Sequence, residues 1–302
     1  MDQYALYQLG EGLNRALPPG ACRWLAERIG EWQWRCSAPD RAAVQANLSL
    51  IHGRPIGPWS GEVREVFRNF GRYLLEFTNA DRVAPADVTI NASPPVDELL
   101  RSGRGALLLS AHVGNWELGA VALAKRGHRV AAVALPHADL RVNRWFDRRR
   151  SGAGVEVIPL GSRATRRCLE LLRAGYLIGI VGDREFGLNG LDVTFFGRQA
   201  MVPRGPALLS LRSGAPAVPT FMIRESFGRF TLQMEPPLWP PERASAEAVD
   251  RLTRQYTAVI ERAIRRFPEQ WLMFRVVGAE RPSDVRQPDS AVSRGAAGPG
   301  AA

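Results

Sequence analysis

A histidine and a carboxylate in one short turn are the residues best suited to chemistry. His112 and Glu117 lie five positions apart in residues 110–117 (SAHVGNWE), which follow an apolar run and begin a helical pattern. A carboxylate bonded to one imidazole nitrogen fixes the tautomer and leaves the other nitrogen free to accept a proton from a hydroxyl group. The spacing predicts a general base, His112, oriented by Glu117. The alternative is a polar turn followed by a glutamate that merely favours a helix N-terminus.

A second polar segment, residues 182–185 (GDRE), also follows a predicted strand. Ligands in α/β sheets bind just past the carboxyl ends of the strands, so Asp183 and Arg184 are candidate substrate-binding residues. A plain surface ion pair between them is equally consistent with the local sequence. The turn at Phe196 and Gly197 is predicted to line an acyl or lipid path, with burial in the core as the alternative.

The elements that must position these segments alternate between strands and helices from Leu99 onward. Short apolar runs predict the strands, and helical spacing predicts the helices between them. The alternation predicts a mixed, mainly parallel α/β sheet flanked by helices, with an antiparallel edge strand at Phe230–Met234. The other predicted strands are Gly105–Ser110, Arg129–Leu135, Val155–Pro159, Tyr176–Gly182 and Ala217–Ile223; the predicted helices are Trp116–Lys125, Arg144–Arg150, Ala164–Ala174, Gly205–Arg212 and a long helix after Ser245.

The first third of the chain has the pattern of helices. Tyr4–Leu17 and Ala21–Trp34 are separated by a Pro-Pro-Gly breaker, and apolar residues from Val63 to Phe77 at steps of three and four predict a buried helix face. Aromatic residues mixed with arginine on the first two helices suit a membrane interface, and packing onto the main domain explains them nearly as well. We predict an N-terminal helical, membrane-associating part over residues 1–98, an α/β core over 99–281 and a disordered tail over 282–302.

The charge is strongly positive and unevenly placed. The chain has 40 basic and 30 acidic side chains, and Lys125 is its single lysine. Codon bias accounts for much of this arginine content. Between Arg141 and Arg173, however, nine arginines stand against three acidic residues, a local net of +6. Such a patch indicates an anionic partner: nucleic acid, an acidic lipid head group, or a phosphate-bearing carrier or cofactor.

Composition excludes several classes of protein. A chain of 302 residues with 45% apolar side chains can build a large core, so a wholly disordered protein is excluded. No apolar run reaches the ~18–20 residues that a membrane span needs. The first ten residues lack the pattern of a secretory signal, so a cytoplasmic location is expected. Three scattered cysteines lack the spacing of a disulfide framework or metal site, so no bound metal is expected.

Several segments, taken in order, resemble one family. They are LLLSAHVGNWELG (107–119), GDRE, FFG (195–197), PRGPALLSLRSGAPAVP (203–219) and PEQWLMF (268–274). The set is similar to the lysophospholipid acyltransferase superfamily, and within it to the bacterial lipid A biosynthesis and phosphatidylinositol mannoside acyltransferases. The resemblance covers about Tyr4 to Val277. Many relatives carry an N-terminal transmembrane helix, whereas residues 1–33 are too polar for one, which favours attachment to the membrane surface.

The resemblance implies an acyltransferase at the cytoplasmic face of the inner membrane. Such an enzyme moves a fatty acyl group from acyl carrier protein or acyl-coenzyme A to a hydroxyl of a glycolipid of the lipid A precursor type, and no cofactor is permanently bound. A phosphatidylinositol mannoside or a lysophospholipid is the alternative acceptor. His112 and Glu117 match the family's catalytic pair.

Further residues are predicted to bind the donor or the acceptor. Backbone N–H groups near Asn115, or an arginine, are candidates to stabilise the oxyanion that forms on the thioester carbonyl. Arg144, Arg149 and Arg150 are predicted to bind phosphate groups, because Arg150 with Gly154 resembles a family R-x3-G block. A solvated helix face is the alternative for these arginines.

Two functions from other classes stay open at this point. A sequence pI near 10.6 and the arginine cluster favour a nucleic-acid-binding protein. Aromatic residues are not interleaved with the cluster and no docking motif is visible, so no nucleic-acid partner is expected. A non-catalytic lipid-binding scaffold would keep the fold, but the presence of both His112 and Glu117 disfavours it.

Overall fold

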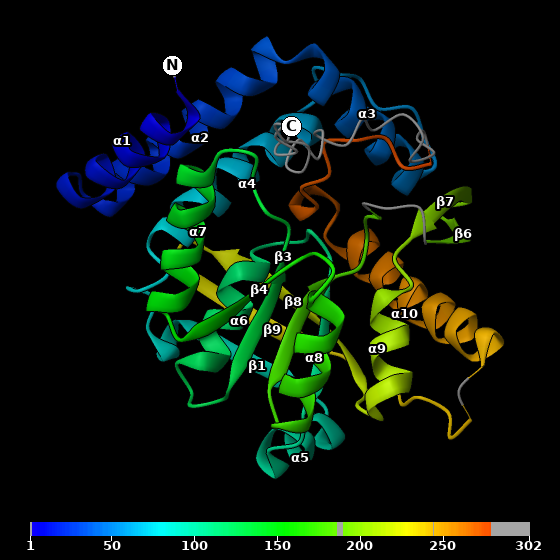
Figure 1. The fold of residues 1–302 in the computed structure, drawn as a ribbon. Helices are drawn as coiled ribbons and strands as arrows, with labels where there is room; N and C mark the ends of the chain where they lie inside the picture. The colour runs from blue at the N-terminus through cyan, green and yellow to red at the C-terminus, as the bar shows by residue number, and fades with distance from the viewer. Residues whose placement is uncertain (1, 186–189, 244, 279–302) are drawn as a thin grey trace, which may run out of the picture.

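A computed structural model describes residues 2–185, 190–243 and 245–278 (Figure 1). These residues form a mixed α/β fold with a mostly parallel seven-stranded sheet, which confirms the predicted fold class. The predicted disordered tail lies outside the described residues. The helices are α1 (Gln3–Ala16), α2 (Pro19–Cys36), α3 (Ala38–His52), α4 (Gly61–Thr78), α5 (Pro94–Ser102), α6 (Trp116–Ala124), α7 (Leu140–Gly152), α8 (Ala164–Arg173), α9 (Gly205–Ser213) and α10 (Ala246–Arg266), with 3₁₀ turns at Pro85–Asp87 and Pro268–Gln270. The strands are β1 (Val88–Ala92), β2 (Ala106–Ser110), β3 (Val130–Ala134), β4 (Val155–Pro159), β5 (Leu177–Val181), β6 (Leu191–Phe195), β7 (Arg198–Val202), β8 (Ala217–Ser226) and β9 (Arg229–Met234).

The main sheet has the strand order β1-β9-β8-β2-β5-β3-β4, and β6 with β7 forms a separate hairpin. Within the main sheet β8 and β9 are antiparallel, and the other neighbouring pairs are parallel. The prediction that Phe230–Met234 is an edge strand was wrong. β1 pairs with β9 on its outer side, so β9 lies inside the sheet. With five residues, β1 shows too short an alternation to be identified from sequence.

The two faces of the sheet carry different helices. Successive side chains of a strand point to opposite faces, and Leu107 and Leu108 of β2 do so here. Leu108 packs in a cluster with α5 and α6, whereas Leu107 packs with α8 and α9. Because both neighbours of β2 are parallel strands with buried faces, β2 reads as a continuous apolar run rather than an alternating one.

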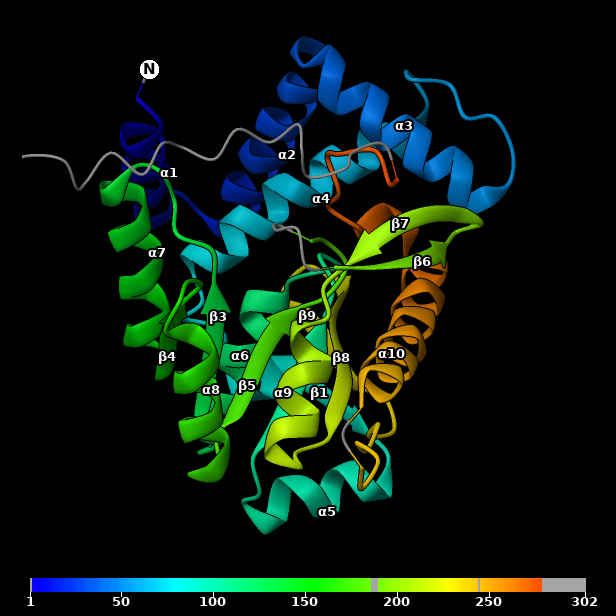
Figure 2. The same cartoon turned by 45° about the vertical axis from the view of Figure 1, so that its right-hand side comes forward.

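Helices α2, α3 and α4 lie across the end of the sheet toward which β3 and β5 point, as Figures 1 and 2 show from two sides. Ser60 caps α4, and Val63, Val66, Phe67, Tyr73 and Phe77 form its buried face, which confirms the predicted stripe. The stripe packs against Leu109 and Val113 at the end of β2 and against residues of α10. The apolar cluster therefore contains residues from both sides of position 98, and the predicted division there stays a prediction.

Candidate active site

The turn after β2 places His112 beside Asp183, which follows β5. β2 and β5 are adjacent parallel strands with Ser110 opposite Val181, so the segments that leave them meet at one edge of the sheet. The Nδ1 atom of His112 lies 2.8 Å from Oδ1 of Asp183, and the His112 backbone N–H donates to Oδ2 at 3.0 Å. Since a carboxylate only accepts, Nδ1 carries a proton, so Nε2 is the nitrogen that bears the lone pair when the imidazole is neutral.

Asp183 is fully buried, with three hydrogen bonds on its carboxylate. Besides the two from His112, the Trp271 indole N–H donates to Oδ2 at 2.8 Å. Burial by itself raises the pKa of Asp183, but the His112 charge and the hydrogen bonds from His112 and Trp271 outweigh it and leave the pKa below its usual value. Asp183 is therefore an ionised carboxylate that can orient the imidazole and stabilise its cation.

The segment after α10 completes the support of this turn. The Leu272 N–H donates to the His112 carbonyl at 2.7 Å, and the Gly114 N–H donates to the Gln270 carbonyl at 2.9 Å. Gly114 has φ +64°, and a Cβ there would lie 1.9 Å from the Met222 carbonyl oxygen. Only glycine fits this approach, so the turn is tied to both β8 and the C-terminal segment.

Glu117 does not contact His112, which corrects the predicted pairing. Its carboxylate accepts two hydrogen bonds from Arg150, from Nε at 2.9 Å and from Nη2 at 2.6 Å. Both side chains are buried, and Arg150 also reaches Asp147 at 3.3 Å. Burial alone would lower the pKa of Arg150, but these carboxylates raise it. Glu117 is in the first turn of α6 and points toward α7. His112 precedes the helix, so helical spacing does not bring the two side chains to the same face.

The three arginines predicted to bind phosphate point to different partners. Arg150 is committed to Glu117, so it is not available to a donor phosphate here. Arg149 forms an ion pair with Glu11 of α1 at 2.7 Å and lies over the Trp145 ring. Arg144 is exposed, and its Nε donates to the Leu140 carbonyl. Positions 144, 149 and 150 of one helix lie in different directions around its axis, so they do not form a single subsite.

Asn115 is buried and serves as the N-cap of α6. Its Oδ1 accepts from the Leu118 N–H, and its Nδ2 donates to Glu76 Oε2 at 2.9 Å. Glu76 also forms a two-point ion pair with Arg224 of β8. Asn115, which the sequence predicts to bind the donor or the acceptor, thus links the turn to Glu76 of α4 and, through it, to β8. Neither Glu76 nor Arg224 carries a sequence signal for this contact.

A cavity of about 310 Å³ adjoins Asp183. Its wall is largely apolar, and Arg184 and Glu185 also line it. The apolar wall includes Leu135, Phe195, Met201, Val202, Met273 and Val277. Arg184 therefore lines this cavity, and its role in binding a substrate stays a prediction.

Phe196 and Gly197 form the turn of the β6–β7 hairpin. Phe196 has φ 52° and is buried 5.5 Å from the Trp271 ring, and Gly197 has φ +79°. It is Phe195, next to them, that lines the cavity. Burial of Phe196 in the core, the alternative weighed from sequence, is what the structure shows, and its ring supports Trp271.

Other candidate groups are ruled out by their surroundings. Cys168 is on the buried face of α8, and burial raises the pKa of its thiol to about 11, so it is not an activated nucleophile. In residues 2–185, 190–243 and 245–278 there is no cluster of metal-ligating side chains. No helix in that part of the chain has the length and apolarity to cross a bilayer.

The edge of the sheet thus carries a contact between His112 and Asp183, with a cavity beside Asp183, and comparisons with known proteins identify the class of protein. The family described as bacterial lipid A biosynthesis acyltransferase matches residues 3–276, and the chain belongs to it. The phosphatidylinositol mannoside acyltransferase of Mycobacterium tuberculosis (strain H37Rv) is 28% identical over 74% of this chain and 73% of its own length. That of Mycolicibacterium smegmatis is 26% identical over 93% of both chains.

Proposed function

We propose that this protein transfers a fatty acyl group from a thioester donor, acyl carrier protein or acyl-coenzyme A, to a hydroxyl of a glycolipid, with His112 as the general base. The contact between His112 and Asp183 carries the proposal, because it leaves Nε2 as the acceptor of a proton. The His112 side chain is 21% exposed, whereas that of Asp183 is fully buried. The base therefore faces the substrate and the carboxylate stays behind it.

In the proposed reaction, Nε2 of His112 accepts the proton of the acceptor hydroxyl while the oxygen attacks the thioester carbonyl carbon. The negative charge of the tetrahedral intermediate resides on the former carbonyl oxygen until the C–S bond breaks. The thiolate leaves and takes the proton from the imidazolium, so the base is regenerated. Asp183 stabilises the transient imidazolium without taking its proton. The step needs no protein nucleophile.

The apolar cavity beside Asp183 is the proposed place of the acyl chain. A thioester carbonyl must come within about 3–3.5 Å of the attacking hydroxyl oxygen, so the chain attached to it needs apolar cover close to His112. Leu135, Phe195 and Met273 line the cavity beside Asp183, the partner of His112, and each methylene buried there contributes about 0.8 kcal/mol. Arg184 at the same wall is the proposed contact for a polar part of the substrate.

A peripheral position at the membrane is part of this proposal. Trp24, Ile29 and Trp32 project from α2 with more than half of their surface exposed. Arg28 and Arg35 lie on the same helix. Tryptophan beside arginine suits the interface of an anionic bilayer, where the rings enter the head-group layer and the guanidinium groups contact phosphate. Attachment there would deliver a lipid acceptor without a membrane span.

The acceptor is proposed as a class, a glycolipid hydroxyl. The family description favours a lipid A precursor, and the names of the mycobacterial relatives favour a phosphatidylinositol mannoside. Incubation of the purified protein with labelled donors and a panel of these acceptors and lysophospholipids, followed by product mass, separates the candidates. His112→Gln should abolish the product, while His52→Gln, an exposed histidine on α3, should not. Product formation by His112→Gln would refute the mechanism.

A further inference from the structure

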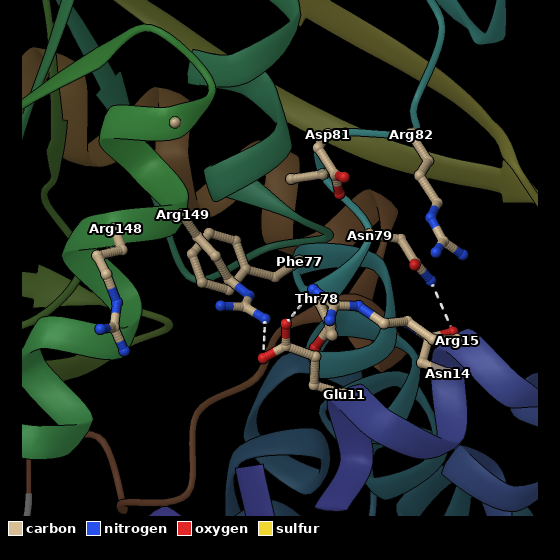
Figure 3. Close-up of a pocket in the computed structure, with 12 residues that line it drawn as sticks. Glu11, Asn14, Arg15, Phe77, Thr78, Asn79, Asp81, Arg82, Arg148 and Arg149 are labelled. Atoms are coloured by element: carbon tan, nitrogen blue, oxygen red, sulfur yellow. Dashed lines mark hydrogen bonds and ion pairs between the residues drawn. The ribbon is translucent and has the colours of Figure 1, made fainter. Parts of the chain in front are cut away.

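A second pocket lies away from the cavity at Asp183, between α1, the end of α4 and α7. Figure 3 shows it with Arg148 at one side, Arg82 at the other, and Arg15 and Arg149 between them. Its volume is about 210 Å³, and it shares no lining residue with the cavity beside Asp183. A molecule bound here would not contact the proposed base.

The arginines of this pocket exceed the acids that it contains. The two carboxylate oxygens of Glu11 lie 2.7 Å from Nη2 of Arg15 and 2.7 Å from Nη2 of Arg149, so one carboxylate forms ion pairs with two guanidinium groups. Arg15 and Arg149 are also in the last turns of α1 and α7, where a cation offsets the partial charge of the helix end. The side chains of Arg82 and Arg148 have no hydrogen bond or ion pair to any residue that the structure describes. With Asp81 counted, four cations stand against two anions.

Two buried donors at the pocket lack an acceptor. Asn14 is 7% exposed, and its Nδ2 has no hydrogen-bond partner among the described residues; the same holds for Nε of Arg149. Both residues line the pocket. Buried N–H groups are satisfied in the great majority of cases, so an acceptor oxygen is expected beside them. A phosphate group has acceptor oxygens for such donors, and its negative charge would offset the excess of arginines in the pocket.

An apolar groove adjoins this pocket. The groove has a volume of about 340 Å³ and shares Asn14, Arg15, Asn79 and Arg82 with the pocket, so the two meet along that wall. Its other lining residues come from α2, α4, the segments that follow α1 and α4, the β8–β9 turn and the start of β9. They are mainly apolar, with Glu76 and Asp87 as the two acids. They include Leu17, Cys22, Leu75, Val83, Phe227 and Phe230. A cationic pocket next to an apolar groove matches a ligand with an anionic head and a hydrocarbon chain.

We propose that this is an accessory site for an anionic phospholipid, with the phosphate in the cationic pocket, beside Arg15 and Arg82 at the wall that it shares with the groove, and one chain in the groove that Phe227 lines. Such a site would bind the N-terminal helices to one class of lipid. This binding would be more selective than the proposed insertion of Trp24 and Trp32 in the bilayer interface. The proposal does not depend on turnover, because the pocket and the proposed base have no residue in common.

The test measures binding of short-chain phosphatidylglycerol, below its micellar concentration, by calorimetry. The double variant Arg82→Gln/Arg148→Gln should weaken the affinity about 10-fold or more, because it removes the charge-assisted contact of Arg82 and lowers the positive charge of the pocket by two. The control is Arg251→Gln/Arg254→Gln, which removes the same charge from the exposed side of α10 and should bind like the wild type. Phe227→Ser should weaken lipid binding while leaving the weak binding of inorganic phosphate unchanged.

Three outcomes would overturn the proposal. They are equal affinity of the wild type and the Arg82→Gln/Arg148→Gln variant, equal affinity for lipid and inorganic phosphate, and displacement of the lipid by coenzyme A at matched concentration, which would assign the pocket to a donor phosphate. The same titration on His112→Gln separates this site from the proposed reaction, since that variant should bind the lipid normally and transfer nothing.

Discussion

The Nδ1 atom of His112 lies 2.8 Å from a carboxylate 71 positions further along the chain, Oδ1 of Asp183. We expect Asp183→Asn to lower kcat by about 10²–10⁴-fold with little change in KM, because an amide neither fixes the same tautomer nor stabilises the imidazolium. Steady-state kinetics would measure this, with Asp192→Asn on the exposed side of β6 as the control. An unchanged kcat would remove Asp183 from the mechanism.

The same carboxylate makes a pH-dependent contribution to stability. The pKa of Asp183 lies below its ordinary value of 3.8, so the folded protein binds fewer protons at this site than the unfolded chain. Its contribution to the free energy of unfolding is therefore complete above the ordinary pKa and is lost as the pH falls through the folded value.

We expect the wild type to exceed Asp183→Asn in unfolding free energy at about pH 5, and by less below about pH 4. Urea titrations of both proteins across this range test the expectation. Other carboxylates with lowered pKa values, such as Glu11 and Glu27, are common to the two proteins and cancel. A difference that does not change down to the lowest pH at which both fold would contradict it.

The buried pair of Glu117 and Arg150 is expected to act on stability. Removing one partner leaves an uncompensated buried charge, so Glu117→Gln or Arg150→Met should each cost about 3–5 kcal/mol of unfolding free energy. The double variant should recover much of this loss, because no buried charge is left without its partner. Chemical denaturation of the three variants measures the cycle. Single variants within about 1 kcal/mol of the wild type would show that the pair is not structural.

Glu76 is expected to position the catalytic turn through Asn115. Glu76→Gln leaves the buried Arg224 without its counter-charge and weakens the hydrogen bond to Asn115, so both stability and kcat should fall. The control is Glu98→Gln, an exposed position on α5. A positioning role predicts partial recovery of kcat in Glu76→Asp, which keeps the charge; no recovery at full folding would argue against it.

The net charge of a sequence segment can overestimate the charge of the surface that it forms, as residues 141–173 show. Residues 141–173 carry a local net of +6, yet many of their arginines pair with carboxylates. Arg141 pairs with Asp2, the N-cap of α1. Arg149 pairs with Glu11 of α1, and Arg150 pairs with Glu117 of α6. The patch that local charge predicts is therefore smaller in the folded protein. Arg148 remains exposed, at the edge of the pocket in Figure 3.

Local pattern was sufficient for most strands of the sheet and for α4, and it selected His112 as a candidate, because apolar periodicity and the residues at strand ends are properties of neighbours in the chain. It did not find β1, so it misplaced β9 at the edge. It could not say which acid meets the imidazole. Glu117 was close in sequence, but the axis of α6 turns it toward Arg150, while the pairing of β2 with β5 brings Asp183 to Nδ1 and the segment after α10 adds Trp271. The order of the strands in the sheet determines which acid lies beside His112, and that order depends on contacts between residues far apart in the chain.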